Sequence, residues 1–260
     1  KIKRLIIIST VIIFLVYTGL GLFLWGVQKS LIYFPSRQDF DSCLGFADSE
    51  KLNLNGTRAY FKKNSGKLVV FYHGNAGSAC MRTYLKGEFE KVGVSYLIVE
   101  YAGFSNDKSK PDKKLLMKDV ENVNDFLAGK KFTQIIVVGE SLGTALATYH
   151  STLMPIDKLL LISPFYRMVD MAQANYPIYP MSLLLTEDYD SDAWIKASKA
   201  KSLEILHGSA DEVVPIDQSK KLFESARITD KKYVEVAGAH HNDIYNFKET
   251  FDNVTLFLDK

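Results

Sequence analysis

The sequence predicts an α/β fold in which a mostly parallel sheet carries helices on both faces. Short apolar runs alternate with helix-compatible segments through most of the chain. The runs are apolar along their whole length, which is typical of strands buried on both faces of a parallel sheet. With 260 residues, of which 47% are hydrophobic, the chain can bury one sizeable core.

The alternation of patterns gives the expected elements in chain order. An early strand of a hairpin is expected at 57–61. Buried strands are expected at 67–72, 94–101, 134–139, 158–162, 202–207 and 232–236. Helices are expected at 80–91, 112–127, directly after Ser141, at 216–226 and at 243–258.

The interval from about 163 to 200 interrupts this alternation. Its prolines and aromatic residues are Pro164, Pro177, Pro180, Tyr166, Tyr176, Tyr179 and Trp194. We expect a long irregular insertion there. It would lie over the edge where the parallel strands end, as a small lid that shapes a binding pocket. The alternative is a simple connection packed by its own aromatic side chains.

Residues 1–30 are predicted to form a transmembrane signal anchor, and residues 31–260 a separate globular domain. The run 5–27 is uncharged and, at about 1.5 Å per residue, is long enough to cross a bilayer. A cleaved signal peptide is the main alternative. The apolar run continues through 22–25 without a small-x-small cleavage site, which favours the anchor.

Flanking charge predicts the orientation of this anchor. Lys1, Lys3 and Arg4 precede the apolar run and outweigh Lys29 and Arg37 after it. Basic residues stay on the cytoplasmic side, so the N-terminus is expected there. The globular domain would then be extracytoplasmic, either periplasmic or lumenal.

Charge and cysteine content exclude some other classes of protein. Lys and Arg (32) nearly balance Asp and Glu (30), so the chain has no electrostatic footprint for nucleic acid. Cys43 and Cys80 are too few for a disulfide framework and lack the spacing of a metal site, so we expect two independent thiols. A single disulfide is the alternative if the domain is extracytoplasmic.

The segment Gly139-Glu140-Ser141-Leu142-Gly143 joins an expected strand to an expected helix. In this context Gly-x-Ser-x-Gly predicts a sharp turn that exposes the Ser141 hydroxyl as a nucleophile. Glycines at 139 and 143 remove side chains that would collide with the neighbouring elements. The alternative is an ordinary glycine-rich turn in which Ser141 caps the helix.

A serine nucleophile needs a general base and a carboxylate that orients the base. His240 and His241 follow the last expected strand, in the loop that reaches the nucleophile in this kind of fold. Either residue satisfies the chain order of serine, acid and histidine. The pattern alone leaves the choice between them open.

Asp211 is the candidate acid, because it directly follows the strand at 202–207 and lies between Ser141 and the two histidines. Glu212 and Asp217 are weaker candidates. Glu212 would point elsewhere, and Asp217 has the position of a helix-start residue.

Two backbone amides are candidates for binding the oxyanion of the reaction. The Leu142 amide lies at the start of the helix after Ser141, where the helix dipole favours negative charge. The Asn75 amide lies in the turn His73-Gly74-Asn75-Ala76-Gly77, whose glycines let the backbone approach a substrate. His73 and His207 are expected to be structural.

These segments together resemble the alpha/beta-hydrolase superfamily. The resemblance is strongest to the membrane-anchored alpha/beta hydrolase domain-containing (Bem-type) serine hydrolases. The motifs that carry it are His73-Gly74-Asn75-Ala76-Gly77, Gly139-Glu140-Ser141-Leu142-Gly143, Ser163-Pro164-Phe165, Tyr176-Pro177, the block 207–215 and His241-Asn242-Asp243.

The resemblance implies a serine hydrolase that cleaves carboxylic esters or thioesters, lipid acyl groups among them. It implies Ser141 as nucleophile, Asp211 as acid and His241 as base. The expected partners are a small-molecule or acylated substrate and the membrane, and neither a metal nor an organic cofactor is required. A membrane-tethered serine aminopeptidase of the same fold and a non-catalytic binding or scaffold protein are the alternatives.

Overall fold

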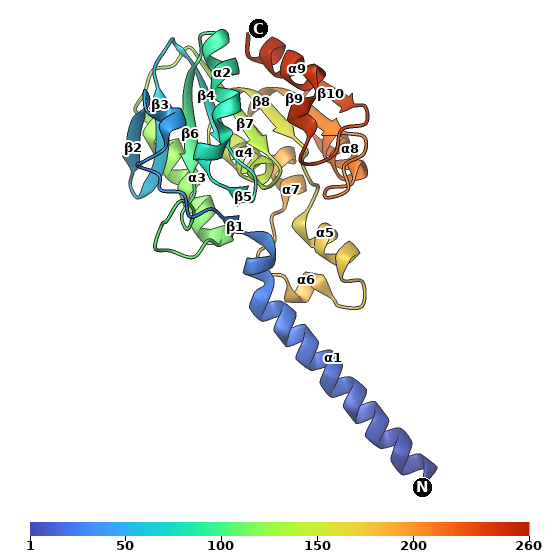
Figure 1. Cartoon of the computed structure of the whole chain (residues 1–260). Coiled ribbons are helices and arrows are strands. Elements are labelled where there is room, and N and C mark those ends of the chain that lie inside the picture. The colour runs from blue at the N-terminus through green and yellow to red at the C-terminus, as the bar shows by residue number, and fades with distance from the viewer. Residues whose placement is uncertain (260) are drawn as a thin grey trace.

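The centre of the structure is an eight-stranded sheet in the order β10-β9-β8-β7-β4-β6-β3-β2, seen in a computed structural model that describes residues 1–259 (Figure 1). Its strands are β2 (Glu50–Leu54), β3 (Thr57–Lys62), β4 (Lys67–Tyr72), β6 (Ser95–Glu100), β7 (Gln134–Glu140), β8 (Ile156–Ile162), β9 (Ala200–Gly208) and β10 (Asp230–Val236). Each neighbouring pair in the part of the sheet ordered β10-β9-β8-β7-β4-β6 is parallel. Strand β3 pairs antiparallel with both β6 and β2. The mostly parallel sheet predicted from the sequence is confirmed.

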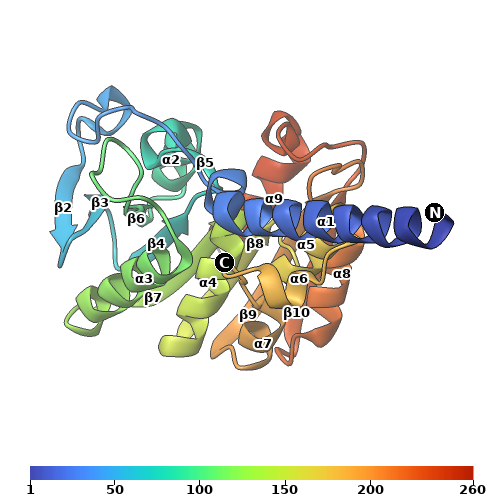
Figure 2. The same cartoon turned by 90° about the horizontal axis from the view of Figure 1, so that it is seen from below.

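Helices cover both faces of this sheet, as expected from its buried strands (Figures 1 and 2). The covering helices are α2 (Thr83–Lys91), α3 (Lys113–Ala128), α4 (Leu142–Leu153), α8 (Ile216–Ser225) and α9 (Lys248–Asp259). The prediction that the last helix begins at 243 is wrong. Asp243 instead accepts a hydrogen bond from the His240 amide at 2.7 Å, which holds a turn there, and the short 3₁₀ helix η3 (Ile244–Asn246) follows.

The insertion at 163–200 is more regular than predicted. It contains three short helices, α5 (Met168–Asn175), α6 (Met181–Leu184) and α7 (Ser191–Lys196). Pro177 follows the end of α5, and Pro180 directly precedes α6, as expected of residues that interrupt helices. The Asp190 side chain caps α7 by accepting a hydrogen bond from the Ala193 amide. Helices α5 and α6 lie between the sheet domain and α1 (Figure 1).

Helix α1 (Ile2–Ile32) projects away from the sheet domain (Figure 1). It extends two residues beyond the predicted boundary at residue 30, and Pro35 in β1 (Phe34–Pro35) follows it. Only Gly21 and Gln28 of this described helix are buried. The helix is long and apolar enough to cross a membrane, as an anchor or a signal sequence would.

The two cysteines form a disulfide, so the expectation of independent thiols is wrong. Their α-carbons lie 5.8 Å apart, within the usual range for a disulfide. Cys43 belongs to the connector after α1, and Cys80 to the 3₁₀ helix η2 (Ala79–Arg82). The two lie 37 residues apart in the sequence, and no local pattern could indicate that the connector packs against η2.

Candidate active site

Ser141 occupies a strained turn between β7 and α4. Its φ of 50° and ψ of −116° lie in a region that residues with a side chain rarely adopt. A β-carbon at Gly139 would lie 2.4 Å from the Gly143 carbonyl oxygen, and one at Gly143 would lie 2.1 Å from the Tyr72 carbonyl oxygen. Both glycines are therefore required by close backbone packing, as predicted.

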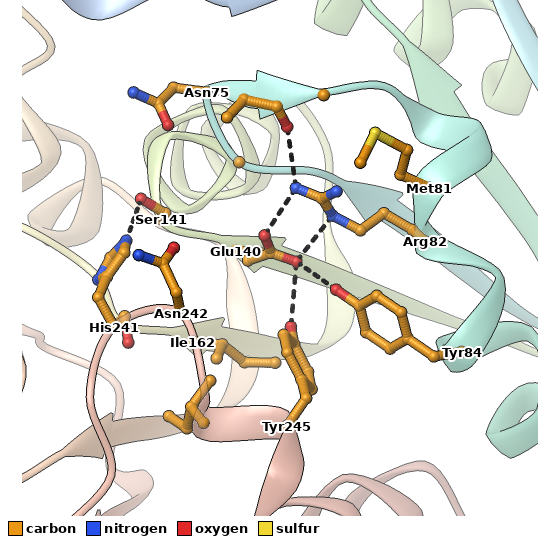
Figure 3. Close-up of a pocket in the computed structure, with 15 residues that line it drawn as sticks. Asn75, Met81, Arg82, Tyr84, Glu140, Ser141, Ile162, His241, Asn242 and Tyr245 are labelled. Carbon is orange, nitrogen blue, oxygen red and sulfur yellow. Dashed lines mark hydrogen bonds and ion pairs between the residues drawn. The ribbon is translucent and has the colours of Figure 1, made fainter. Parts of the chain in front are cut away.

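The structure brings Ser141, His241 and Asp211 together from three separate loops. His241 Nε2 lies 2.9 Å from Ser141 Oγ. His241 Nδ1 lies 2.7 Å from the carboxylate of Asp211. Because an ionised carboxylate can only accept, Nδ1 carries the hydrogen in this contact. Nε2 of the neutral ring is then free to accept the serine proton (Figure 3).

Asp211 is buried and held by several donors. Its Oδ1 accepts hydrogen bonds from the amides of Val213 (3.0 Å) and Val214 (2.7 Å), and His207 Nε2 lies 3.2 Å from Oδ2. Burial raises the pKa of Asp211, but the contacts with His207 and His241 and the Val214 amide lower it more. The net pKa lies well below that of an ordinary aspartate, so the carboxylate stays ionised. His207 thus has a structural position, as predicted.

His240 points away from the serine. Its Nδ1 lies 2.9 Å from Glu212 in an exposed ion pair, whose hydrogen bond raises the pKa of His240. The two histidines left open by the sequence therefore occupy different environments. Glu212 thus contacts the ring of His240, while Asp211 contacts the ring of His241.

The two candidate oxyanion amides belong to Leu142, directly after the serine, and to Asn75, which lines the same cavity. Leu142 is the first residue of α4, and the first amides of a helix have no acceptor within it. Asn75 lies in the turn after β4, which the sequence after α1 holds in place. Phe34 donates its amide to the Asn75 carbonyl at 2.9 Å, and Asn75 Nδ2 donates to the Ile32 carbonyl at 2.8 Å. The end of α1 thus fixes one wall of the site.

Ser141 opens into a cavity of about 260 Å³, which we call the serine cavity. It is lined by, among others, Asn75, Arg82, Glu140, Ser141, Ser163 and His241. Ser163 also has a positive φ, 52°, and its buried Oγ has no hydrogen-bond partner in residues 1–259. Within the same range, no cluster of three or more His, Cys, Asp or Glu side chains is arranged to hold a metal ion.

A network centred on Glu140 forms one wall of the serine cavity (Figure 3). Arg82 donates to Glu140 from Nε at 3.1 Å and from Nη2 at 3.0 Å. The hydroxyls of Tyr84 (3.1 Å) and Tyr245 (3.2 Å) donate to the same carboxylate. Burial and the charge of Glu140 raise the pKa of Tyr245 well above its ordinary value, which keeps the phenol a donor.

Arg82 also donates from Nη2 to the Ala76 carbonyl at 3.1 Å. It therefore connects the turn that carries Asn75 to the residue before Ser141. Sequence reasoning assigned no role to Arg82, Glu140 or Tyr245. Arg82 and Tyr245 lie 58 and 105 residues from Glu140, so no local motif could have indicated the network.

The chain has relatives among curated proteins, although no protein-family model matches it. It is 31% identical over 247 residues to the uncharacterized protein Rv2307c of Mycobacterium tuberculosis, and the match covers 89% of this chain and 86% of that protein. It is 28% identical over 226 residues to human protein ABHD12B, with 76% of this chain and 62% of that protein covered.

Solved structures of hydrolases share the fold. The Pyrococcus furiosus esterase Pf2001 superposes with a TM-score of 0.69 at 16% identity, covering 87% of this chain and 96% of that one. The Paleococcus ferrophilus monoacylglycerol lipase has a TM-score of 0.60 at 17% identity, with 81% and 98% covered. The chain thus has the alpha/beta-hydrolase fold that this esterase and this lipase share. It belongs to one family with Rv2307c of Mycobacterium tuberculosis.

Proposed function

We propose that the protein is a membrane-anchored serine hydrolase that cleaves carboxylic esters or thioesters through an acyl-enzyme on Ser141. The observation that carries this proposal is the continuous hydrogen-bonded chain from Ser141 Oγ to His241 (2.9 Å) and from His241 to Asp211 (2.7 Å). A serine hydroxyl is a weak nucleophile at neutral pH, and this arrangement supplies the base that activates it.

In the first step, His241 Nε2 takes the hydroxyl proton while Ser141 Oγ attacks the carbonyl carbon of the substrate. The amides of Leu142 and Asn75 donate to the oxyanion that forms. His241 then returns the proton to the departing alcohol or thiol, which leaves an acyl group on Ser141. Asp211, held ionised, stabilises the positively charged ring of His241 during the transfer.

In the second step, water attacks the acyl-enzyme. His241 accepts a proton from that water, and the same two amides hold the second oxyanion. Collapse of this intermediate releases the carboxylic acid and returns the proton to Ser141. The nucleophile, the base, the acid and the oxyanion donors in this cycle all belong to the chain itself.

Two features support an extracytoplasmic domain held by α1. The basic residues Lys1, Lys3 and Arg4 precede the apolar run, a bias that keeps the N-terminus cytoplasmic. The Cys43–Cys80 disulfide suits an oxidising compartment. The proposed domain would therefore face the periplasm or a lumen, with residues 5–27 in the membrane.

Aminopeptidase activity on the same fold is less favoured by the charges of the cavity. A free α-amino group needs an unpaired carboxylate, and Glu140 is the acidic residue among the described residues that line the serine cavity. Arg82 already neutralises it in a two-point contact. Esters without a positive charge fit this wall better.

Steady-state hydrolysis tests the proposal. The full-length protein in detergent should release nitrophenol from p-nitrophenyl esters, and hydroxylamine should divert the acyl group to a hydroxamate. Aminoacyl anilides should be poor substrates. The serine-hydrolase proposal fails if Ser141→Ala hydrolyses the esters as fast as the wild type.

A further inference from the structure

The insertion makes direct contact with the middle of α1. The rings of Tyr17 and Tyr179 stack with their centroids 4.7 Å apart. Tyr17 donates its hydroxyl to the Ile178 carbonyl at 2.9 Å, and Tyr179 donates to the Tyr17 carbonyl at 3.1 Å. Gly21 is buried in this contact, where an added β-carbon would lie 3.2 Å from the Tyr179 ring. Figures 1 and 2 both show α6 beside α1.

The position of Tyr17 fixes the depth of this contact. Tyr17 precedes Val27 by ten residues, which is about 15 Å along the helix and half of a hydrocarbon core of about 30 Å. If the bilayer instead began on the N-terminal side of Tyr17, the uncharged residues available to span it would be 5–16. They cover about 18 Å, which is too short to cross the hydrocarbon core. Ile178 and Tyr179 must therefore lie at bilayer depth if α1 spans the membrane.

The segment of the insertion that contacts α1, residues 171–185, has a composition that suits the interior of a bilayer. It carries no charged side chain. Ile178 and Leu183 expose 69% and 82% of their surface, so no protein group covers them. Exposed apolar residues at this level would be solvated by lipid.

The two side-chain amides of the segment are hydrogen-bonded within it, as lipid requires. Gln173 donates to the Pro177 carbonyl at 3.2 Å and accepts from the Met181 amide at 3.1 Å. Asn175 donates to the Met171 carbonyl at 2.8 Å. Pro177 and Pro180 have no amide hydrogen to satisfy. These bonds lower the desolvation cost of placing Gln173 and Asn175 in a bilayer.

A groove lies between α1 and this segment, with a volume of about 320 Å³. We call it the anchor groove, and its apolar lining includes Leu24, Leu31, Ile32, Met168, Met171 and Met181. No acidic or basic side chain of the described residues lines it. Unbranched methionines adapt to flexible ligands. Ile32 in its wall holds Asn75, which lines the serine cavity, so the two spaces adjoin at the Asn75–Ile32 hydrogen bond.

We infer that residues 171–185 are immersed in the lipid bilayer beside α1, and that the anchor groove binds an acyl chain of a membrane lipid. This inference rests on the proposed membrane anchoring. It identifies the substrate as one that reaches Ser141 from the membrane. The bilayer is the environment indicated for the exposed side chains of Ile178 and Leu183, because the Tyr17–Tyr179 contact holds their segment against the apolar helix α1.

Depth-dependent quenching tests the immersion in the full chain reconstituted in phosphatidylcholine nanodiscs. Because Cys43 and Cys80 are paired, an introduced cysteine alone should react with an environment-sensitive fluorophore. The labelled variants are Ile178→Cys and Leu183→Cys, with Val16→Cys as the control within α1 and Leu44→Cys, 89% exposed, as the control outside it. Lipids with a nitroxide deep in the acyl chain should quench positions 178 and 183 as strongly as position 16, and leave position 44 unaffected.

The controls separate two kinds of failure. If position 16 is quenched but positions 178 and 183 behave like position 44, the anchor stands and the immersion is overturned. If position 16 is not quenched either, the proposed membrane anchoring fails, and the inference fails with it.

Crosslinking tests the groove itself. A phosphatidylcholine with a diazirine at the end of one acyl chain should, on irradiation, label peptides that contain Met171 or Met181. Labelling confined to the exposed face of residues 5–16 would overturn the groove assignment.

Placing charges on the exposed residues Ile178 and Leu183 should affect only the delivery of substrates from the membrane. Ile178→Asp with Leu183→Asp should slow hydrolysis of a vesicle-borne ester about tenfold without slowing that of a soluble ester, and equal slowing of both would contradict the inference.

Discussion

The serine cavity and the anchor groove adjoin at Asn75, but the side chains that line them differ in polarity. The serine cavity is lined by charged and hydroxylated side chains whose hydrogen bonds fix them to three loops of the sheet edge. The anchor groove is lined by flexible apolar side chains of α1 and the insertion. The difference separates two tasks, because chemistry requires fixed geometry and binding of an acyl chain requires adaptable surface.

The largest effect should follow the loss of the base in the serine cavity. His241→Ala should lower kcat for a p-nitrophenyl ester by about 10⁴-fold, as loss of a triad member does. His240→Ala is the matched control, because His240 contacts Glu212 at the surface. The assignment of the base would be wrong if His240→Ala lost more activity than His241→Ala.

Loss of Arg82 should have the next largest effect. Arg82→Met breaks the contact that joins the Asn75 turn to Glu140, so kcat should fall about 100-fold through misplacement of the oxyanion donor. The partly buried Glu140 would also lose its counter-charge, at a cost of about 2 kcal/mol in unfolding free energy.

A double variant separates these two consequences of the Arg82 change. Arg82→Met with Glu140→Gln should regain stability in urea unfolding, because no charge is left unpaired, and should not regain kcat. Recovery of both together would show that Arg82 only stabilises the fold and does not position the turn.

The serine cavity and the anchor groove should also contribute differently to the pH dependence of the unfolding free energy. The pKa of Asp211 is lower in the folded chain than in the unfolded chain, so its ionised form stabilises the fold. This contribution is complete above about pH 4 and is lost as pH falls through the folded pKa. Wild type should exceed Asp211→Asn by about 2 kcal/mol near neutral pH, and the gap in unfolding free energy should close in acid. A gap that stays constant with pH would contradict this. The anchor groove, without a carboxylate or histidine, should contribute no such slope.

The smallest effect should come from narrowing the anchor groove. Ala172, half-buried on α5, lines the groove, and Ala172→Trp would fill part of it. The ratio of kcat/KM for a sixteen-carbon ester to that for a four-carbon ester should fall about tenfold, since lost apolar contact costs about 1.5 kcal/mol. An unchanged ratio would exclude the groove from substrate binding.

The sheet and the turn at Ser141 could be predicted because their causes are local. Continuous apolar runs indicate strands buried on both faces, and the Gly-x-Ser-x-Gly pattern lies in one short segment. Gly139 is required by contacts within that segment, while Gly143 is required by its approach to Tyr72 on the neighbouring strand. Asp211 and the loop that carries His240 and His241 were also predictable, because the topology of parallel strands brings loops that follow β7, β9 and β10 to one edge.

The remaining features depend on long-range packing. The contact of Tyr17 with Tyr179 joins residues 162 positions apart, and the Cys43–Cys80 disulfide depends on how the connector crosses the domain. The choice between His240 and His241 depended on which side chain the turn at Asp243 directs toward the site. Neither the Tyr17–Tyr179 contact nor the disulfide has a periodic or motif signature.

Labelling with a fluorophosphonate probe tests the central claim most directly, since the probe reacts only with an activated serine. Full-length protein in detergent should form a single adduct, and mass spectrometry should locate it on the peptide that contains Ser141. His241→Ala should react far more slowly, and Ser141→Ala should not react. Absence of labelling in the wild type, or labelling that persists in Ser141→Ala, would contradict the account of Ser141 as the nucleophile.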